Sequence, residues 1–265
     1  MPIVAWKCPG CNGATVPLDH YATSPCGLTH VHPSFAAAVL HHDRAHYTRG
    51  TGVVEVSNGL GCPRQAGIEK GEIAVNPLEY NAMMGGTAWH EVMEQHVPAD
   101  YQIEYVVKGA LGMVPIQGKI DYLSRKHSLI GDWKTKTCFK AASIAKDGAE
   151  PDNVAQLSLY AALVEQQDGW RPKHGTIWYR FAAAGLKPVH VTLMSPEAVL
   201  AYKPTKNDKY TVMDLLRATD AMYQGVVKWE DLPLVGESMF FGAKTKCEYC
   251  TSRDTCWTQA KGAPF

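Results

Sequence analysis

The sequence predicts an α/β fold in which helices flank a central mixed sheet. Short alternating apolar segments, which are typical of strands, span 53–56, 101–108, 113–123, 128–134, 175–181 and 187–193. Segments of helical character lie between and around them, at 34–47, 77–94, 154–164, near 195 and over 211–229. Both element types within one chain of 265 residues indicate one large domain with an appendage.

The appendage is an N-terminal arm, which we place at residues 1–48, and the main domain follows at 49–265. Up to about residue 33 the arm is rich in Cys, His, Gly and Pro and has few periodic apolar positions. The next segment, 34–47, suits a helix because Ser34 can cap it and its interior is rich in alanine. We therefore expect an arm too small to fold on a core of its own.

Within the arm, Cys8-Pro-Gly-Cys11 is a tight turn that can point both sulfur atoms at one ion. We expect a tetrahedral zinc site that holds the arm together, with ligands Cys8, Cys11, Cys26 and His30. His32 or His20 can replace His30 in this scheme. The alternative is a loose tail in which these cysteines and histidines are incidental.

The charge balance gives no sign of a general affinity for nucleic acid. The formal net charge is zero, with 26 basic and 26 acidic residues, so any such contact must come from local patches and bound metal. We find no apolar run long enough to span a bilayer and no signal-peptide pattern, and we expect a soluble cytoplasmic protein without membrane contact. In that setting eight cysteines indicate metal or cluster ligation before disulfides.

The stretch from Gly118-Lys-Ile-Asp121 to Gly131-Asp-Trp-Lys134 is the most informative part of the main domain. We expect two strands joined by a polar turn, and alternation then puts Asp132 and Lys134 on one face and Trp133 on the other. Pairing would bring Asp121 alongside. Two carboxylates could bind Mg²⁺ or Mn²⁺, and the ammonium could orient water, as phosphodiester cleavage requires. The alternative is a surface ion pair that contributes little.

Two predicted helices supply further candidates. His90, within 77–94, is either a core histidine or a nitrogen ligand for the same metal. Gln156 and Tyr160 are four residues apart and share a helix face, from which both can hydrogen-bond to phosphate or base. The alternative for this pair is an ordinary helix flank.

The C-terminal cysteines indicate a second metal centre. Cys247, Cys250 and Cys256 lie within ten residues of otherwise polar sequence. Three thiolates leave one coordination position to fill, in a zinc site or an iron–sulfur cluster. Cys62 is the natural fourth ligand, although alone it reads equally well as a buried thiol. Thiolates bind both zinc and iron–sulfur clusters, and the spacing does not choose between them.

In combination these motifs resemble the RecB-like nucleases of the PD-(D/E)XK superfamily. His90, Asp121, Asp132-Trp-Lys134 and Gln156-x-x-x-Tyr160 occur in the order and rough spacing of that group. The cysteine set resembles its branch with a [4Fe–4S] cluster, which includes CRISPR-associated spacer-trimming nucleases and the nuclease domain of AddB helicase subunits. The resemblance spans about residues 53–256. Asp132 stands where Glu is common and Ile120 where the superfamily name has Pro, and the CxxC arm is not part of the pattern.

The resemblance implies a restriction-endonuclease-like core with an iron–sulfur subdomain. It implies Mg²⁺ or Mn²⁺ ligands at His90, Asp121, Asp132 and the carbonyl of Trp133, with Lys134 assisting the attacking water. It further implies that Glu104 supports the metal site and that Gln156 and Tyr160 contact DNA. The cluster would be held by Cys62, Cys247, Cys250 and Cys256.

The expected activity is that of a metal-dependent DNase, an exonuclease on single-stranded DNA, DNA ends or flaps. By analogy it would serve recombination, repair or the processing of phage or mobile-element DNA, with recombination or helicase partners, and an oligomer is compatible with this. A nucleic-acid-binding or assembly module that keeps the fold without turnover is the alternative. The intact His/Asp/Asp/Lys set argues against that reading, and a purely structural zinc protein would leave Asp121 and Lys134 unexplained.

Overall fold

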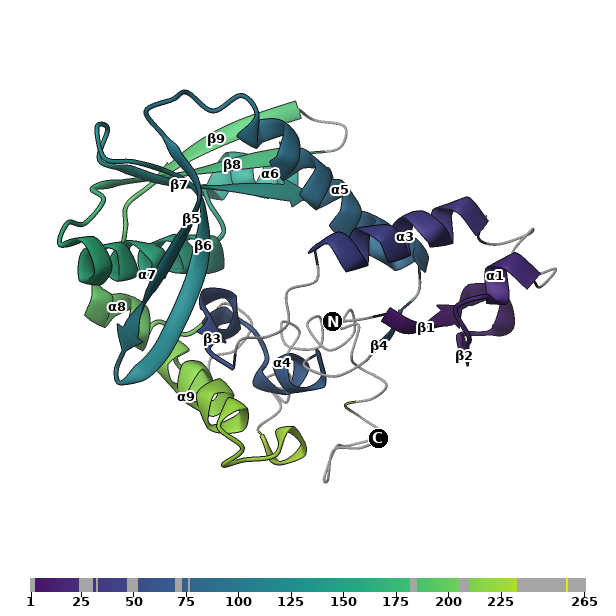
Figure 1. The fold of residues 1–265 in the computed structure, drawn as a ribbon. Coiled ribbons are helices and arrows are strands. Elements are labelled where there is room, and N and C mark those ends of the chain that lie inside the picture. The colour runs from purple at the N-terminus through teal and green to yellow at the C-terminus, as the bar shows by residue number, and fades with distance from the viewer. Residues whose placement is uncertain are drawn as a thin grey trace.

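The structure is a computed structural model, and it describes residues 3–23, 31, 33–46, 52–69, 73–75, 77–181, 185–204, 210–232 and 256. A six-stranded mixed sheet with helices packed against it forms the main body, and the N-terminal arm lies to one side (Figure 1). The predicted α/β fold with a central mixed sheet is confirmed. None of the helices in the described part of the chain is long and apolar enough to cross a membrane.

The sheet is organised around β6 (Val114–Ser124). β5 (Gln102–Leu111) pairs antiparallel along the whole of one edge of β6. The opposite edge is shared by two strands. β3 (Val54–Glu55) pairs with its beginning, and β7 (Leu129–Lys136) pairs only with its last three residues. β6 and β7 therefore separate just before Tyr122, and a fork opens between them at Asp121.

Beyond β7 the sheet continues through β8 (His174–Phe181) and β9 (Gly185–Val191). β7 and β8 are parallel, whereas β8 and β9 form an antiparallel pair. A parallel pair needs a long crossover connection, which α6 (Phe139–Asp147) and α7 (Pro151–Asp168) supply here. The sequence predicts no helix between the strand 128–134 and the helix 154–164, and that prediction is wrong because α6 lies there.

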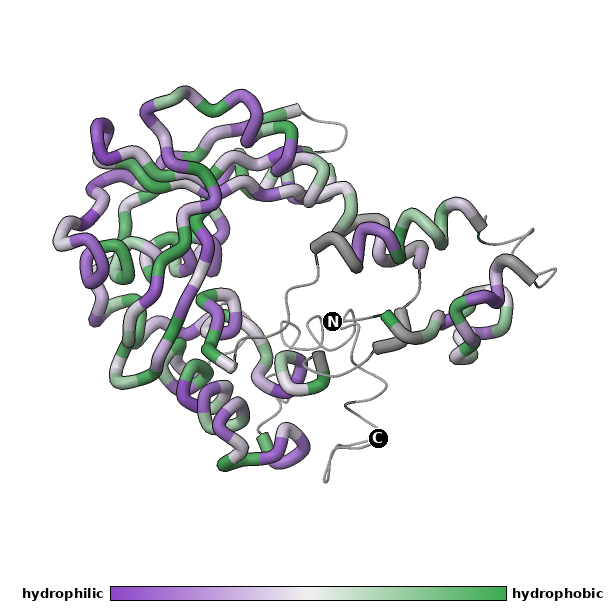
Figure 2. The backbone as a smooth tube through the Cα atoms, viewed as in Figure 1, coloured by the Kyte–Doolittle hydropathy of each residue, from purple (hydrophilic) through white to green (hydrophobic). Residues whose placement is uncertain are grey.

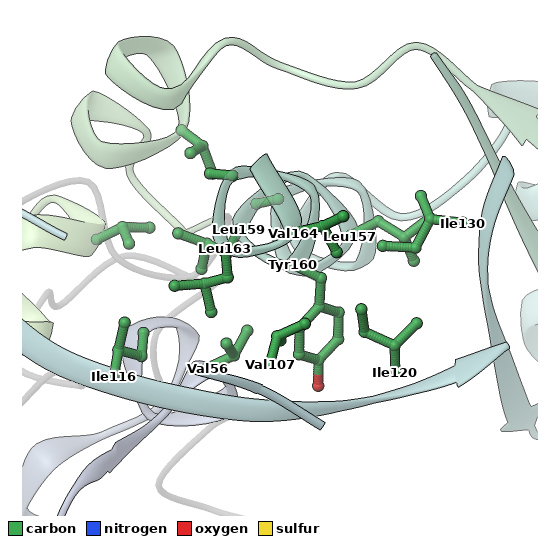
Figure 3. Packing of buried hydrophobic residues seen from close by; sticks show 14 of the residues in the cluster. Val56, Val107, Ile116, Ile120, Ile130, Leu157, Leu159, Tyr160, Leu163 and Val164 are labelled. Carbon is green, nitrogen blue, oxygen red and sulfur yellow. The ribbon is translucent and has the colours of Figure 1, made fainter. Parts of the chain in front are cut away.

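Helix α7 is the centre of the apolar core. It contacts β5, β6, β7 and β8, and its middle turns are buried on all sides because α8 (Pro196–Ala201) packs on it as well. Its side chains meet those of the sheet and of the 3-10 helix η2 (Val56–Leu60), as Figure 3 shows. The helix begins at Pro151 after the N-cap residue Glu150, earlier than the predicted start at 154.

Two further helices close this side of the body. α9 (Val212–Tyr223) packs on η2 and on α4 (Pro63–Glu69), and hydrophobic and hydrophilic residues alternate along it (Figure 2). Thr211 caps α9 in a reciprocal pair of hydrogen bonds with Asp214. The helix ends at Tyr223, well before the predicted Trp229, and a turn with Gly225 at φ 73° leads into η3 (Trp229–Asp231).

The arm is more structured than the sequence predicts. β1 (Ile3–Cys8) pairs antiparallel with β2 (Ala14–Val16) and parallel with β4 (Ile73–Val75), next to α1 (His20–Thr23) and α3 (Pro33–His46). A small apolar cluster fills the arm and consists of Ile3, Trp6, Cys8, Tyr21, Val31, Ala36, Val39 and Tyr80. The arm therefore has an apolar core, which it shares with Tyr80 of the later helix α5 (Pro77–Glu94).

One helix connects this arm to the sheet. α5 (Pro77–Glu94) begins beside α3 and runs to β7, as Figure 1 shows. The buried carboxylate of Asp43, on α3, accepts hydrogen bonds from the Ile3 amide at 3.1 Å and from the Tyr80 hydroxyl at 3.3 Å. Burial, followed by the charge of Asp43, raises the pKa of Tyr80 to about 12. These two hydrogen bonds tie β1, α3 and the start of α5 together.

Substitution at Gly131 tests the packing at the fork. A Cβ added at Gly131 would collide with the ring of Tyr122, so Gly131→Ala should lower the free energy of unfolding by about 1–3 kcal/mol. Gly85 lies within α5, and no described atom lies within 4 Å of a Cβ built there. Gly85→Ala should therefore raise the free energy of unfolding by about 0.5–1 kcal/mol. Urea denaturation of both variants measures the two effects, and an unaffected Gly131→Ala would contradict the packing described.

Candidate active site

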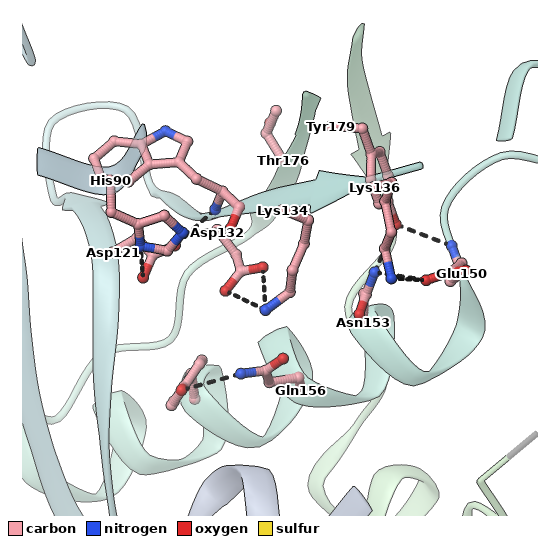
Figure 4. Close-up of polar contacts among 12 residues, drawn as sticks. His90, Asp121, Asp132, Lys134, Lys136, Glu150, Asn153, Gln156, Thr176 and Tyr179 are labelled. Carbon is pink, nitrogen blue, oxygen red and sulfur yellow. Dashed lines mark hydrogen bonds and ion pairs between the residues drawn. The ribbon is translucent and has the colours of Figure 1, made fainter. Parts of the chain in front are cut away.

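The candidate active site lies at the fork between β6 and β7. Where the strands separate, the side chain of Asp121 takes over as acceptor: its Oδ2 receives a hydrogen bond of 2.6 Å from the backbone N–H of Trp133 (Figure 4). This bond holds the Asp121 carboxylate against β7. The predicted convergence of Asp121 with the Asp132-Trp-Lys134 strand is thus a feature of the structure.

Alternation along β7 places the other two charged groups as predicted. Lys134 Nζ lies 3.1 Å from Oδ1 and 2.9 Å from Oδ2 of Asp132, on the same face of the strand (Figure 4). Trp133 between them is buried and stacks on Tyr122, with ring centroids 5.2 Å apart. Asp132 is only 3% exposed, so the alternative of a surface ion pair is wrong.

His90 reaches this point from α5. Its Nε2 lies 2.8 Å from the carbonyl oxygen of Trp133, and its Nδ1 lies 3.8 Å from Oδ1 of Asp121. The imidazole also makes an edge-on contact with the Trp133 ring at 5.6 Å. The structure therefore brings His90, Asp121 and the Trp133 carbonyl together, and Asp132 precedes Trp133 on the same strand.

The site contains two buried carboxyl groups and one ammonium group. Burial, and then the charge of Asp132, raise the pKa of Asp121 well above its usual range, although the Trp133 N–H and Lys134 act against this. Burial alone would lower the pKa of Lys134, but the charge of Asp132, its hydrogen bond and the charge of Asp121 outweigh burial and raise it. The lysine is accordingly an ammonium ion that balances only one of the two buried carboxylates.

A divalent cation fits this arrangement. Oδ2 of Asp132 is buried and, although it is paired in charge with Lys134, it receives no hydrogen bond of good geometry from any described residue. Carboxylate and carbonyl oxygens with one imidazole suit Mg²⁺ or Mn²⁺. His90, Asp121, Asp132 and the carbonyl of Trp133 could hold such an ion.

Glu104 occupies an unusual place opposite Asp121. It lies on β5 with φ at 52°, and it interrupts the ladder between the pairs Ile103–Tyr122 and Tyr105–Ile120. The Glu104 carboxylate forms an ion pair with Lys119, and its charge contributes to the raised pKa of Asp121. Burial, followed by the charge of Glu104, raises the pKa of Glu94 at the end of α5. The sequence gives no sign of this break in the ladder or of Glu94.

Gln156 and Tyr160 share a face of α7, as predicted. Gln156 Nε2 donates a hydrogen bond of 3.2 Å to the Tyr160 hydroxyl (Figure 4). The Tyr160 ring is 6% exposed and packs in the core over Gly118, so it is more buried than a residue expected to contact DNA with its ring (Figure 3). Burial, and then the negative charge of Asp132, raise the pKa of the Tyr160 hydroxyl.

A polar group beside the site is absent from the sequence predictions. Lys136 forms an ion pair with Glu150, to which Lys140 also pairs at 3.3 Å. Asn153 Nδ2 donates to the hydroxyl of Tyr179 at 2.9 Å, next to this pair (Figure 4). The period of two that links Asp132 to Lys134 extends to Lys136, so the pattern could have identified this lysine. Glu150 and Tyr179 carry no comparable signal.

The cysteine predictions are only partly covered by the described residues. Cys62 and Cys256, far apart in sequence, lie close enough for Cys62 to affect the pKa of Cys256. Cys8 and Cys11 lie together in the arm with His20, the residue named as a substitute for His30. Four of the predicted ligands fall outside the described residues: Cys26, His30, Cys247 and Cys250.

Arg64 lies beside the Cys62–Cys256 pair. It is 6% exposed, its Nε donates to the carbonyl of Leu232, and its Nη1 has no hydrogen-bond partner among the described residues. Burial raises the pKa of the Cys256 thiol, while the hydrogen bond and charge of Arg64 lower it. A buried guanidinium in this position requires a nearby anion, and thiolate ligands of a metal centre would provide one.

Comparisons with known proteins give a family match and two solved structures. The family model described as the PD-(D/E)XK nuclease superfamily matches residues 59–257. The crystal structure of SSO0001 superposes with a TM-score of 0.51 and 14% identity, over 86% of this chain and 96% of that one, and the likeness is one of fold. A phage related exonuclease from Haemophilus somnus 129PT is 10% identical, with a TM-score of 0.33 over 79% of this chain and 93% of its own. No curated protein matches the chain.

Metal binding should release a proton from Asp121. Its raised pKa keeps the carboxyl protonated at pH values above the ordinary pKa of Asp, and a cation that binds the carboxylate must displace that proton. Titration calorimetry with Mn²⁺ in two buffers of different ionisation enthalpy should show release of about one proton at low pH. The release should decline to zero as the pH rises through the raised pKa.

Asp121→Asn is the control for this measurement. It should weaken Mn²⁺ binding and remove the pH-dependent proton release. If the wild type binds Mn²⁺ but releases no proton at any pH, or if the variant releases as many protons, Asp121 is not the group displaced.

Proposed function

The chain belongs to the PD-(D/E)XK nuclease superfamily, and on this basis we propose that it is a metal-dependent nuclease that hydrolyses phosphodiester bonds in DNA. One observation carries the proposal: two buried carboxylates, an ammonium and an imidazole converge at the fork between β6 and β7. A site with more buried acid than base is suited to a divalent cation and a phosphate rather than to a neutral ligand.

Each group has a distinct role in this proposal. His90, Asp121, Asp132 and the carbonyl of Trp133 would hold Mg²⁺ or Mn²⁺, which when bound supplies Lewis-acid stabilisation of the phosphate and a more acidic water. Lys134 keeps its proton, so it would donate hydrogen bonds to the attacking water or to a phosphate oxygen rather than act as the base. Water would attack phosphorus in line with the leaving 3′ oxygen, and the P–O3′ bond would break.

The substrate is proposed by analogy. The resemblance to RecB-like nucleases favours an exonuclease on single-stranded DNA, DNA ends or flaps, in recombination, repair or the processing of phage or mobile-element DNA. With zero net charge the chain would bind DNA through local groups, for which Gln156 and the Tyr160 hydroxyl are candidates. The nuclease domain would comprise residues 49–265, with residues 1–48 as a separate arm.

We further propose that Cys62, Cys247, Cys250 and Cys256 bind a [4Fe–4S] cluster. The proximity of Cys62 to Cys256 supports this, since the two residues lie at opposite ends of the domain's sequence. The buried Arg64 guanidinium supports it as well, because a cluster held by four thiolates is an anion that would balance its charge. A zinc ion in the N-terminal arm would take no part in catalysis.

A paired cleavage assay tests the nuclease. Lys134→Ala should lower the rate of cleavage of end-labelled single-stranded and duplex DNA at least about 100-fold, because it removes a cation that would act on the transition state. Lys126→Ala is a matched control: Lys126 lies in the turn between β6 and β7, is 70% exposed and pairs only with Asp100 among the described acids. Its rate should stay within about twofold of the wild type, as expected for a surface pair.

Each outcome of that assay has a defined meaning. Cleavage by the wild type that requires Mn²⁺ or Mg²⁺ and is lost in Lys134→Ala supports the proposal. Equal activity in both proteins would indicate a contaminant or a different catalytic lysine. DNA binding without cleavage by the wild type would instead favour the non-catalytic binding or assembly module.

Iron content tests the cluster independently of activity. Anaerobically purified wild type should contain iron and a broad absorbance band at the blue end of the visible spectrum, and Cys256→Ser should lose both. Cys138→Ser is the control, since Cys138 is exposed and outside the proposed ligand set. Zinc in place of iron would show that the thiolates form a zinc site, and iron retained in Cys256→Ser would remove Cys256 from the set.

A further inference from the structure

We propose that Cys8, Cys11 and His20 form a structural zinc site in the N-terminal arm, with His20 rather than His30 as the imidazole ligand. The proposal goes beyond the nuclease activity and does not depend on it. It changes the ligand set that the sequence favours, because the structure brings His20 to the cysteine turn.

The distances between donor atoms suit one ion. The two sulfur atoms and one ring nitrogen of His20 all lie within 4.8 Å of one another, and Cys11 Sγ is 3.8 Å from His20 Nε2. Zinc bonds of about 2.3 Å to sulfur and about 2.1 Å to nitrogen, at a tetrahedral angle, place such atoms about 3.6 Å apart. The observed spacing is close to that value.

The backbone presents both cysteines on the inside of a tight turn. Cys8 ends β1, Pro9–Cys11 form a short 3-10 turn, and Asn12 and Gly13 follow with φ of 55° and 77°. The Gly13 amide donates to the Cys8 carbonyl at 2.9 Å, and β2 then returns alongside β1. The left-handed pair at 12 and 13 lets the chain reverse within a few residues, which keeps both sulfur atoms near each other.

A second set of contacts fixes His20. The His20 amide donates to the Pro17 carbonyl at 3.1 Å, and the indole N–H of the buried Trp6 donates to the Leu18 carbonyl at 3.0 Å. These bonds anchor the segment between β2 and α1, so the imidazole is held by the same core that contains Cys8. Cys8 is buried, and Cys11 and His20 are half-buried. These three donors leave the fourth position of a tetrahedral zinc ion to a further ligand.

Zinc would stabilise the part of the molecule from which α5 starts. The core around Cys8 includes Tyr80 of α5, and β1 pairs with β4, the strand that precedes this helix. Because the ion would bind the folded arm and not the unfolded chain, its binding would increase the free energy of unfolding of this core. The function we infer for the ion is to keep the arm folded against α5.

Metal content and cobalt spectra test the ligand assignment on the full-length chain. His20→Ala should lose zinc, about one ion per chain, relative to the wild type, and His30→Ala should retain it. All variants, and the protein with which they are compared, carry Cys256→Ser so that the C-terminal thiolates bind less metal. His30 is a matched control because it is a histidine of the same arm that the sequence favoured. Retention of zinc by His20→Ala together with its loss in His30→Ala would overturn the proposal.

A ligand exchange keeps the test decisive if His20→Ala fails to fold. His20→Cys supplies a third thiolate, so it should still bind Co²⁺ and should increase the thiolate-to-cobalt absorbance, whereas His30→Cys should leave the spectrum unchanged. A wild type that binds neither Zn²⁺ nor Co²⁺ in the arm would show that Cys11 and His20 only share a hydrogen bond. None of these readings depends on DNA cleavage, so failure of the zinc site and failure of the nuclease are distinguishable.

Discussion

The hydrogen bond from the Trp133 amide to the Asp121 carboxylate determines the arrangement of the whole site. β6 and β7 pair over only three residues each, and beyond that point the ladder would be left with an unsatisfied amide. The Asp121 side chain satisfies it and in doing so spans the opening between the strands. Because Trp133 is fixed there, Asp132 and Lys134 face one side of the strand and the Trp133 carbonyl meets His90.

This arrangement is costly for folding. Two carboxylates with little solvent contact, one ammonium to balance them and Glu104 in a left-handed conformation are each unfavourable in an otherwise apolar body. The surrounding core is extensive enough to bear that cost, since α7 packs against four strands and is covered by α8 on its other side. Unfavourable features gathered at one point of a well-packed scaffold are typical of a functional site.

Much of this could be predicted from local sequence. Alternation in 128–134 predicted the common face of Asp132 and Lys134, and the spacing of Gln156 and Tyr160 predicted their contact. What escaped prediction depends on tertiary pairing. The left-handed conformation of Glu104 lies where β5 pairs with β6, and the arm's core forms only when Trp6 and Tyr21 meet Tyr80 from a distant helix. Short helices such as α6 are only marginally stable in isolation, and packing against neighbouring elements determines whether they form.

Helix α5 contacts both the arm and the sheet. Tyr80 is held by Asp43 in the arm and His90 by the Trp133 carbonyl in the sheet, about 15 Å apart along the helix axis. A helix is stiff over that length, so it behaves as a lever with one end in each region. Gly85 and Gly86 lie midway between the two attachments, and the helix bends most easily there. A tilt of the arm would therefore move the His90 imidazole relative to the carboxylates of Asp121 and Asp132. The flexibility of the helix at the two glycines determines how much of the tilt is transmitted to His90.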